Sequence, residues 1–262
     1  MPITGALAAA GGEWHRPDPA DLYQPFFSIG PVLITRPMVI MLISTLLIMG
    51  LLWLGVRNLK MVPGKGQFFL ESIYSFVRND IALNLIGGQH FKKYVPLLFT
   101  FFLFVFTMNF MGLFPLTMTA PTSVIGVPIA LTAIAYITYH LAGIQKKGLG
   151  GYFGSMVPSG VPGWIKPVVF VLELFSYFIT RPLTLALRLF GNMFAGHMLI
   201  VLFVMGGVFL LTQGPALALA GAGSLLMGAL MFVFKMLIMT VQAYVFTLLT
   251  ASYIGDAVSD DH

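Results

Sequence analysis

The chain has 262 residues, of which 58% are hydrophobic and 9% charged, and its formal net charge is +5. Soluble globular domains carry about 25% charged residues, so a mean hydropathy of +0.92 excludes an ordinary soluble domain and indicates a multi-pass membrane protein. The absence of cysteine excludes disulfides, thiol catalysis and cysteine-based metal sites. The basic residues lie mainly in loops, which is typical of membrane topology, and we expect no nucleic-acid partner.

The N-terminal residues 1–37 are rich in proline and mixed in charge, and we predict an extramembrane tail. They lack the basic segment followed by an apolar core that marks a cleavable signal peptide. Residues 38–56 are uncharged and long enough for a first membrane span. Arg57, Lys60 and Lys65 follow, so the positive-inside rule places this end in the cytoplasm and the N-terminus outside.

Residues 64–84 are predicted to form an amphipathic helix. The segment is too polar to span a bilayer but is suited to lying in the interface. Its apolar stripe comprises Phe69, Ile73, Phe76 and Val77, and its polar stripe comprises Glu71, Ser75, Arg78 and Asn79.

Two further spans are predicted at 94–114 and 124–143, joined by the uncharged turn FPLTMTAPTS. Lysine pairs flank the outer ends of this hairpin, so both ends agree with the same cytoplasmic side. The pairs are Lys92 with Lys93, and Lys146 with Lys147. A connector rich in glycine and proline, with room for a short re-entrant turn, follows.

Two long apolar stretches, 167–211 and 216–254, form the C-terminal part of the chain. As one helix, the first would measure about 68 Å at about 1.5 Å per residue, about twice the thickness of a bilayer. Either a break near Arg181 and Pro182 divides it into two spans, or it is one strongly tilted helix. With the preceding spans, these stretches make a single membrane domain, 38–262.

Ionisable groups inside membrane segments are rare and usually face a bundle interior or a water-filled cavity. Thr184, Arg188 and Asn192 follow the spacing i, i+4, i+8 and share one helix face. Gly191 and Ala195 lie beside that face and are small enough to let another helix approach. The candidate set is Glu173, Arg181, Arg188, His197 and Lys235, with Asn192 and Gln242 as uncharged partners.

The helical phases separate His197 from Arg188, because nine residues correspond to about 180° of rotation. Lys235 and Gln242 share a face of the last helix. The set offers a permanent cation, a histidine that can exchange protons, an acid and two amides. This combination fits ion translocation better than a pocket for an organic substrate.

Structural roles remain alternatives for several of these side chains. Arg181 is expected to be structural, and Glu173 could pair with Lys166 or Arg181. His197 could be a satisfied buried histidine, and Lys235 could extend to the membrane surface or pair with another group.

Two other function classes compete with a subunit of an ion-translocating complex. A stand-alone transporter or channel would be expected to contain repeat symmetry, which is absent from the sequence. A purely structural membrane scaffold would leave Arg188 without a role. No Walker motif, HExxH or GxSxG is present, so we expect no catalysis by this chain alone.

The sequence LALRLFGNMFAGH at 185–197 closely resembles subunit a of the F-type ATP synthase, the stator of a membrane rotor. LELFSYFITRP, VQAYVF, MNFMGLFP and FFLESIYSFVRN add to the resemblance, which covers most of the chain from about residue 30. It implies an all-α polytopic membrane protein with one N-terminal span, an amphipathic surface helix, a short transmembrane hairpin and a long tilted hairpin beside the c-ring. It therefore favours the tilted helix, and it places the C-terminus in the cytoplasm.

The resemblance also implies roles for single residues. Arg188 would face a ring of c subunits, each carrying one membrane-embedded carboxylate. Asn192 and Gln242 match the asparagine and glutamine of the family's proton path. His197 occupies a position associated with the outer half-channel, and Glu173 matches an acid associated with the half-channel on the other side.

Lys235 departs from the family pattern, because an acid or a histidine usually stands seven residues before the glutamine. A lysine cannot form a carboxylate–histidine pair with His197. Either the outer half-channel is built differently, or Lys235 is partly neutral, because burial disfavours the charged form of an amine.

The partners implied by the resemblance are the c-subunit ring, the b subunits of the peripheral stalk, the F1 sector and the lipid bilayer. No cofactor and no metal are expected. The membrane would be a bacterial inner membrane or, as the alternative, a mitochondrial inner membrane. The sequence leaves the coupling ion open between proton and sodium, because the choice of ion resides mainly in the c-ring.

Overall fold

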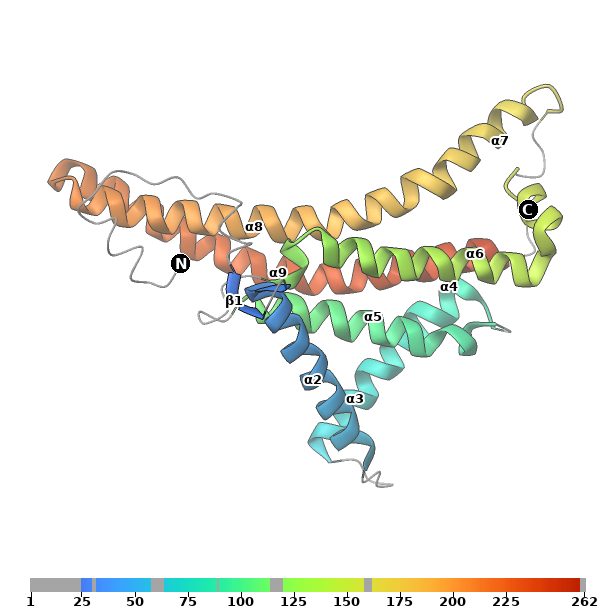
Figure 1. Ribbon diagram of the computed structural model, residues 1–262, viewed down its shortest axis with the longest axis horizontal. Coiled ribbons are helices and arrows are strands. Elements are labelled where there is room, and N and C mark those ends of the chain that lie inside the picture. Colours follow the sequence, from blue (N-terminus) through green and yellow to red (C-terminus); the bar gives the residue numbers. More distant parts are fainter. Residues whose placement is uncertain are drawn as a thin grey trace. The chain divides into compact units, whose positions relative to one another are not determined.

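The computed structural model describes residues 25–29, 32–57, 64–88, 90–113, 120–157 and 162–259. These residues are helical apart from turns, short connections and one antiparallel hairpin, β1 (Pro25–Ile29) and β2 (Val32–Thr35) (Figure 1). Five of the described helices are long and apolar enough to cross a membrane. The predicted class of helical polytopic membrane protein is confirmed, whereas the hairpin lies in the tail where no element was predicted.

The first three long helices are α2 (Arg36–Arg57), α5 (Phe91–Met111) and α6 (Gly126–Gly154). The predicted range 38–56 lies inside α2. The turn predicted after α5 falls mostly at 114–119, outside the described residues. Helix α6 continues beyond the predicted end at 143, so part of the predicted connector is helical. Gly148 interrupts this extension with φ of 69°, a value that glycine adopts without the steric cost that other residues incur.

The predicted amphipathic helix consists of α3 (Lys65–Ser75), the π-helical segment η3 (Phe76–Leu83) and α4 (Asn84–Ile86). Val77 and Ile81 are completely buried, whereas Phe69 is exposed. The predicted apolar stripe is therefore split between the core and the surface. A π-helical turn contains more residues than an α-helical turn, so the faces drift relative to the period assumed for the whole segment.

The long apolar stretch forms α7 (Lys166–Phe175), the π-helical segment η5 (Ser176–Thr180) and α8 (Arg181–Thr212). These elements are continuous from Lys166 to Thr212, so the chain does not break at Arg181 and Pro182. After a turn at Gly214, where φ is 119°, α9 (Pro215–Val258) follows.

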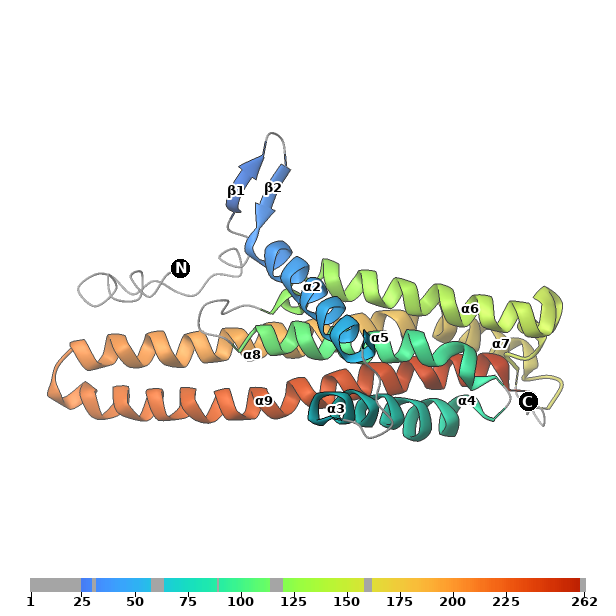
Figure 2. The same cartoon turned by 90° about the horizontal axis from the view of Figure 1, so that it is seen from below.

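The chain divides into two compact units. The first unit comprises Met1–Ser44, Met108–Val124 and Phe190–Val241, and the second unit comprises Thr45–Thr107, Ile125–Leu189 and Gln242–His262. In the second unit α5, α6 and the end of α9 lie side by side (Figure 2). Two apolar clusters hold these elements together. One of them joins Phe101 on α5, Leu131 on α6, Leu185 and Leu189 on α8, and Phe246 on α9.

Lysine contacts mark one end of the second unit. Lys146 Nζ donates a hydrogen bond to the carbonyl oxygen of Val258 over 2.6 Å. Lys93 Nζ donates to Gln145 Oε1 over 3.0 Å. The C-terminal end of α9 therefore lies at the same end of this unit as both lysine pairs.

In the first unit the backbones of α8 and α9 approach closely at two glycines. A Cβ atom added to Gly221 would lie 2.8 Å from the carbonyl oxygen of Gly207, so neither position has room for a larger side chain. Ser224 Oγ donates to the carbonyl oxygen of Phe203 over 2.8 Å. Small residues permit this backbone contact between membrane helices.

Candidate functional site

Arg188 lies on α8 in the second unit, beside the stripe that packs against the rest of the bundle. Its neighbours Leu185 and Leu189 are buried in the cluster with Phe246, whereas Arg188 itself is exposed. Among the described residues, no carboxylate forms an ion pair with Arg188. A permanent cation is thus presented to the outside of this chain without a counter-charge from its described part.

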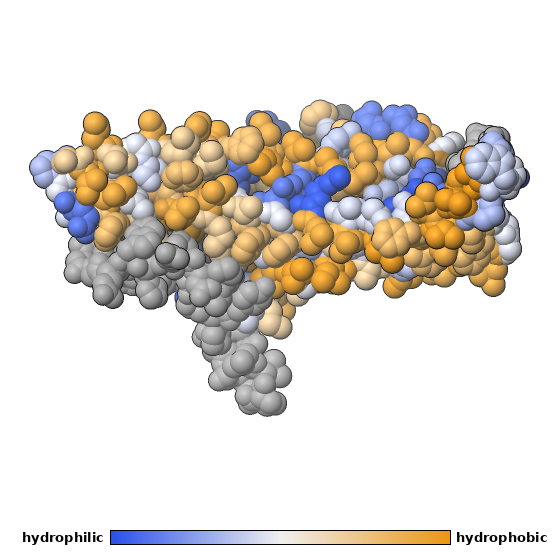
Figure 3. Space-filling view, turned by 90° about the horizontal axis from the view of Figure 1, so that it is seen from above, coloured by the Kyte–Doolittle hydropathy of each residue, from blue (hydrophilic) through white to orange (hydrophobic). Residues whose placement is uncertain are grey.

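The α8 face that carries Arg188 is largely uncovered. Thr184 and Ala195 are exposed and Asn192 is partly exposed. A Cβ atom added to Gly191 would meet nothing within 4 Å. Figure 3 shows a mainly hydrophobic face of the molecule in which hydrophilic groups interrupt the apolar surface. Such an uncovered, small and partly polar helix face has the composition that lets a helix of another chain approach.

Gln242 lies on α9 in the same unit as Arg188. Its side chain is buried, and the next residue, Ala243, belongs to the same cluster as Leu189 of α8. The structure therefore places the amide inside the bundle, near the level at which Arg188 leaves it.

Lys235 and His197 belong to the first unit. Lys235 is 5% exposed, and its stem passes 3.8 Å from the position of a Cβ atom on Gly196, the residue before His197. His197 is partly buried and makes contacts of its own. The described residues of this unit include no aspartate or glutamate. Burial of an ammonium group without a carboxylate is costly. Either polar contacts offset this cost at Lys235, or a function of the amine requires it.

Glu173 lies on α7 in the second unit and is partly buried. The alternative that it pairs with Arg181 does not hold. Arg181 Nη1 instead lies 3.1 Å from Asp256 Oδ2. Among the described residues, no ion pair involves Glu173. Nothing in the sequence around Asp256 singles it out, and its position on the last turn of α9 brings it to Arg181.

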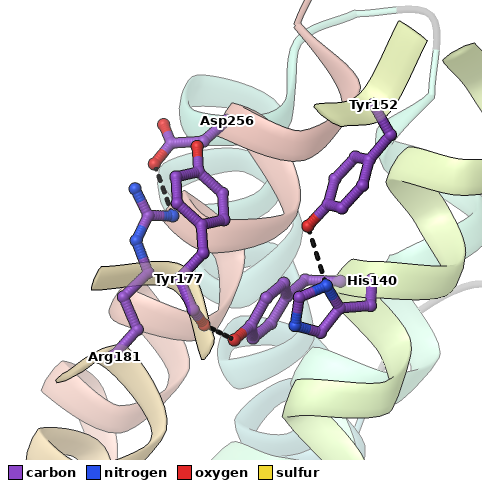
Figure 4. Close-up of polar contacts among 6 residues, drawn as sticks. His140, Tyr152, Tyr177, Arg181 and Asp256 are labelled. Carbon is purple, nitrogen blue, oxygen red and sulfur yellow. Dashed lines mark hydrogen bonds and ion pairs between the residues drawn. The ribbon is translucent and has the colours of Figure 1, made fainter. Parts of the chain in front are cut away.

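Arg181 contacts two aromatic rings in addition to the carboxylate of Asp256. Its guanidinium carbon lies 3.7 Å from the ring centroid of Tyr177 and 4.9 Å from that of Tyr253. Nearby, Tyr139 Oη donates to the carbonyl oxygen of Tyr177 over 2.7 Å (Figure 4). The expectation that Arg181 is structural agrees with these contacts. A cation and several aromatic rings near one helix end carry no sequence signature, so sequence reasoning missed the tyrosines.

The candidate residues thus divide between the two units. The second unit holds Glu173, Arg181, Arg188 and Gln242, and the first unit holds Asn192, His197 and Lys235. Among the described residues, no group of three or more histidine, cysteine, aspartate or glutamate side chains could hold a metal ion.

Five of the described helices are of membrane-spanning length, and α8 carries an exposed arginine. These features define a polytopic membrane protein with a charge on the surface of a long membrane helix. The profile of the ATP synthase A chain family matches residues 38–255. The chain belongs to this family, and the resemblance found in the sequence is confirmed.

Individual relatives agree over most of the chain. A protein of Pseudarthrobacter chlorophenolicus named ATP synthase subunit a is 42% identical over 228 residues, which cover 87% of this chain and 86% of that protein. Proteins of the same name from Parafrankia sp. and Nocardioides sp. are 39% and 38% identical, and the matches cover 99% and 98% of this chain and 89% and 91% of their own lengths.

Proposed function

We propose that this chain is the proton-translocating stator subunit of a bacterial F-type ATP synthase, and that Arg188 is its contact with the rotor. Membership of the ATP synthase A chain family supports the subunit assignment. The observation that carries the role of Arg188 is its exposure on α8 without a carboxylate partner in the described chain.

The exchange of one proton follows from electrostatics. A rotor carboxyl group that faces lipid must be protonated, because an ionised acid in hydrocarbon is too costly. Opposite the Arg188 guanidinium the ionised form is favoured, since an opposite charge stabilises it. The carboxylic acid then releases its proton to one half-channel, and the carboxylate takes a new proton from the other.

Arg188 also separates the two half-channels. A fixed cation repels a proton that would pass directly between them, and arginine keeps its charge even when buried, whereas a lysine can lose its proton. Rotation then becomes the route between the channels. The membrane potential supplies about 2.3 kcal/mol per charge per 100 mV, and the separated channels convert that drop into torque.

The half-channels are assigned to the two groups of polar residues. His197 and Lys235 serve the outer channel, and Glu173 serves the channel on the other side. Gln242, which is buried on α9 in the same unit as Arg188, and Asn192, which shares the helix face of Arg188, belong to the proton path. Lys235 stands where the family usually has an acid or a histidine, and the described residues of the first unit contain no carboxylate. Either Lys235 acts as a neutral amine beside His197, or the outer channel is built differently.

The topology proposed here places the lysine pairs and the C-terminus in the cytoplasm. The hydrogen bond from Lys146 to the carbonyl oxygen of Val258 supports a common end for them. The N-terminus then lies outside, and the continuous helix Lys166–Thr212 lies tilted in the bilayer, since it is longer than the bilayer is thick. The partners are the c-ring, the b subunits and, through the complex, the F1 sector.

Purification of the affinity-tagged chain from its own membrane tests the assignment. A ring of small two-helix proteins and a soluble ATPase head are expected to co-purify. Ala195→Cys is expected to crosslink to a cysteine on the outer helix of the c-ring in the native complex. Recovery of the chain without these partners would favour a stand-alone transporter, and crosslinking only from His197→Cys would reverse the proposed orientation of α8.

A further inference from the structure

The π-helical segment η5 leaves one backbone carbonyl without a donor from its own helix. In a π-helix a carbonyl accepts from the N–H five residues later, and the Arg181 N–H bonds the carbonyl oxygen of Ser176 in this way. The corresponding donor for Tyr177 would be residue 182, which is proline and has no N–H. Tyr139 on α6 fills the gap, because its hydroxyl donates to the Tyr177 carbonyl oxygen.

Arg181, the residue that follows this segment, is held by contacts with α9 and with Tyr177. Arg181 contacts Asp256 and the ring of Tyr177 (Figure 4). Its guanidinium carbon also lies 4.9 Å from the ring centroid of Tyr253. Arg181 Nη1 is one of the buried nitrogens without a hydrogen bond among the described residues, so its contact with Asp256 is an ion pair. Both charged side chains are partly shielded from solvent, at 17% and 41% exposure.

The anchored arginine and the exposed arginine lie on nearly the same face of α8. They are seven residues apart, which corresponds to two turns, about 10 Å along the axis and about 20° of rotation. Both belong to the second unit. Fixing the rotation of α8 at Arg181 therefore fixes the direction in which Arg188 leaves the bundle.

We propose that Tyr139, Arg181 and Asp256 are positioning residues that hold the π-turn and thereby aim Arg188 at the rotor. The proposal rests on the proposed function, because it assumes a rotor opposite Arg188. Relaxation of η5 toward an ordinary α-helical turn would rotate the following helix by up to about 100°, the rotation of one residue. Arg188 would then turn away from the surface at which the carboxylates pass.

Disulfide crosslinking in the assembled complex measures this rotation. Ala195→Cys reports on the exposed side of α8 and Met193→Cys on a buried position, each paired with one cysteine on the outer c-ring helix. The parent complex is expected to crosslink strongly from position 195 and weakly from position 193. Tyr139→Phe is expected to lower the ratio of these yields about fivefold, as the loss of the hydrogen bond to a buried carbonyl implies.

Tyr136→Phe is the matched control, because Tyr136 lies on the same helix and makes ring contacts but its hydroxyl has no hydrogen bond among the described residues. It is expected to keep the ratio of the parent. Asp256→Asn is expected to lower the ratio, and the exchange of charges in the double variant Arg181→Asp with Asp256→Arg is expected to restore part of it. Immunoblots of the membranes report whether each variant assembles.

The outcomes separate this proposal from the proposed function. Equal ratios for the parent, Tyr136→Phe, Tyr139→Phe and Asp256→Asn, in a complex that crosslinks from position 195, would overturn the positioning role alone. The absence of crosslinks from both positions, 193 and 195, in the parent complex would instead overturn the proposed function. If Asp256→Asn does not assemble, the ratio in Tyr139→Phe decides, because this variant removes a single hydroxyl.

Discussion

Two arginines on α8 differ in how their charge is balanced. Arg181 has a carboxylate at 3.1 Å and a tyrosine ring at 3.7 Å, both from its own chain. Arg188 lies seven residues later on nearly the same face, and the described chain offers it no carboxylate. Asp256 and Tyr253 of α9 contact Arg181, whereas Phe246 of α9 packs against Leu185 and Leu189, the buried neighbours of Arg188.

The difference shows two ways in which the permanent charge of an arginine in a membrane helix is balanced. Desolvation of a guanidinium must be offset by a partner. Where the chain supplies the partner, the arginine contributes to folding. Where it does not, the partner belongs to another molecule, and removal of the arginine is expected to cost activity and leave stability unchanged.

The largest effect is expected from Arg188→Ala. Coupled proton pumping by inverted membrane vesicles should fall to background, because no fixed cation then favours ionisation of the rotor carboxyl group. The amount of assembled complex should be unchanged. Normal ATP-driven pumping in this variant would contradict the role of Arg188.

Gly191→Leu should have the second largest effect. The chain itself leaves this position open, so the variant chain should keep its thermal stability in detergent. In the complex, a side chain here should block the rotor and lower pumping about tenfold or more, since small residues allow close helix contact. Gly223→Leu is the control, because nothing lies within 4 Å of a Cβ there either, and it should leave pumping unchanged.

Arg181→Met should reverse the pattern of Arg188→Ala. It breaks a partly shielded ion pair and should lower the free energy of unfolding by about 1–2 kcal/mol, measured by thermal aggregation in detergent. Pumping should fall only several-fold. Equal losses of stability in Arg181→Met and Arg188→Ala would remove the distinction between the two arginines.

The smallest effect is expected from Lys235→Met. Methionine keeps an unbranched stem against Gly196 and removes a buried amine that has no carboxylate in the described first unit. We expect stability to rise by about 1 kcal/mol and pumping to fall a few-fold through the outer half-channel. Lys235→Arg keeps the charge and should not gain stability; a gain of equal size would show that packing, not charge, sets the result.

The sequence predicts some of these features and not others for physical reasons. Uninterrupted apolar stretches predict the membrane-length helices, because the thickness of the bilayer fixes their length. The motif around Arg188 predicts the family, which the comparisons confirm. Residue spacing along one helix also predicts the shared face of Arg188 and Asn192.

The remainder depends on contacts between distant parts of the chain. The pair of Arg181 and Asp256 joins two helices, and helical periodicity contains no information on such a pair. The carbonyl oxygen of Tyr177 in the π-turn before Pro182 accepts a hydrogen bond from Tyr139 on another helix. Pro182 by itself is compatible with a break and with a continuous helix, so the sequence does not distinguish them. The residues of β1 and β2 lack the strong alternation of apolar and polar residues that predicts a β-strand.

The π-turn Ser176–Thr180 also gives the chain tolerance to a change of length. One extra residue is accommodated in a single wide turn while α7 and α8 remain helical on both sides. A chain shorter by one residue at this point could close an ordinary α-helical turn and keep Glu173 and Arg188 facing as they do here. We therefore expect that deletion of one residue from Ser176–Thr180 leaves the directions of both side chains unchanged.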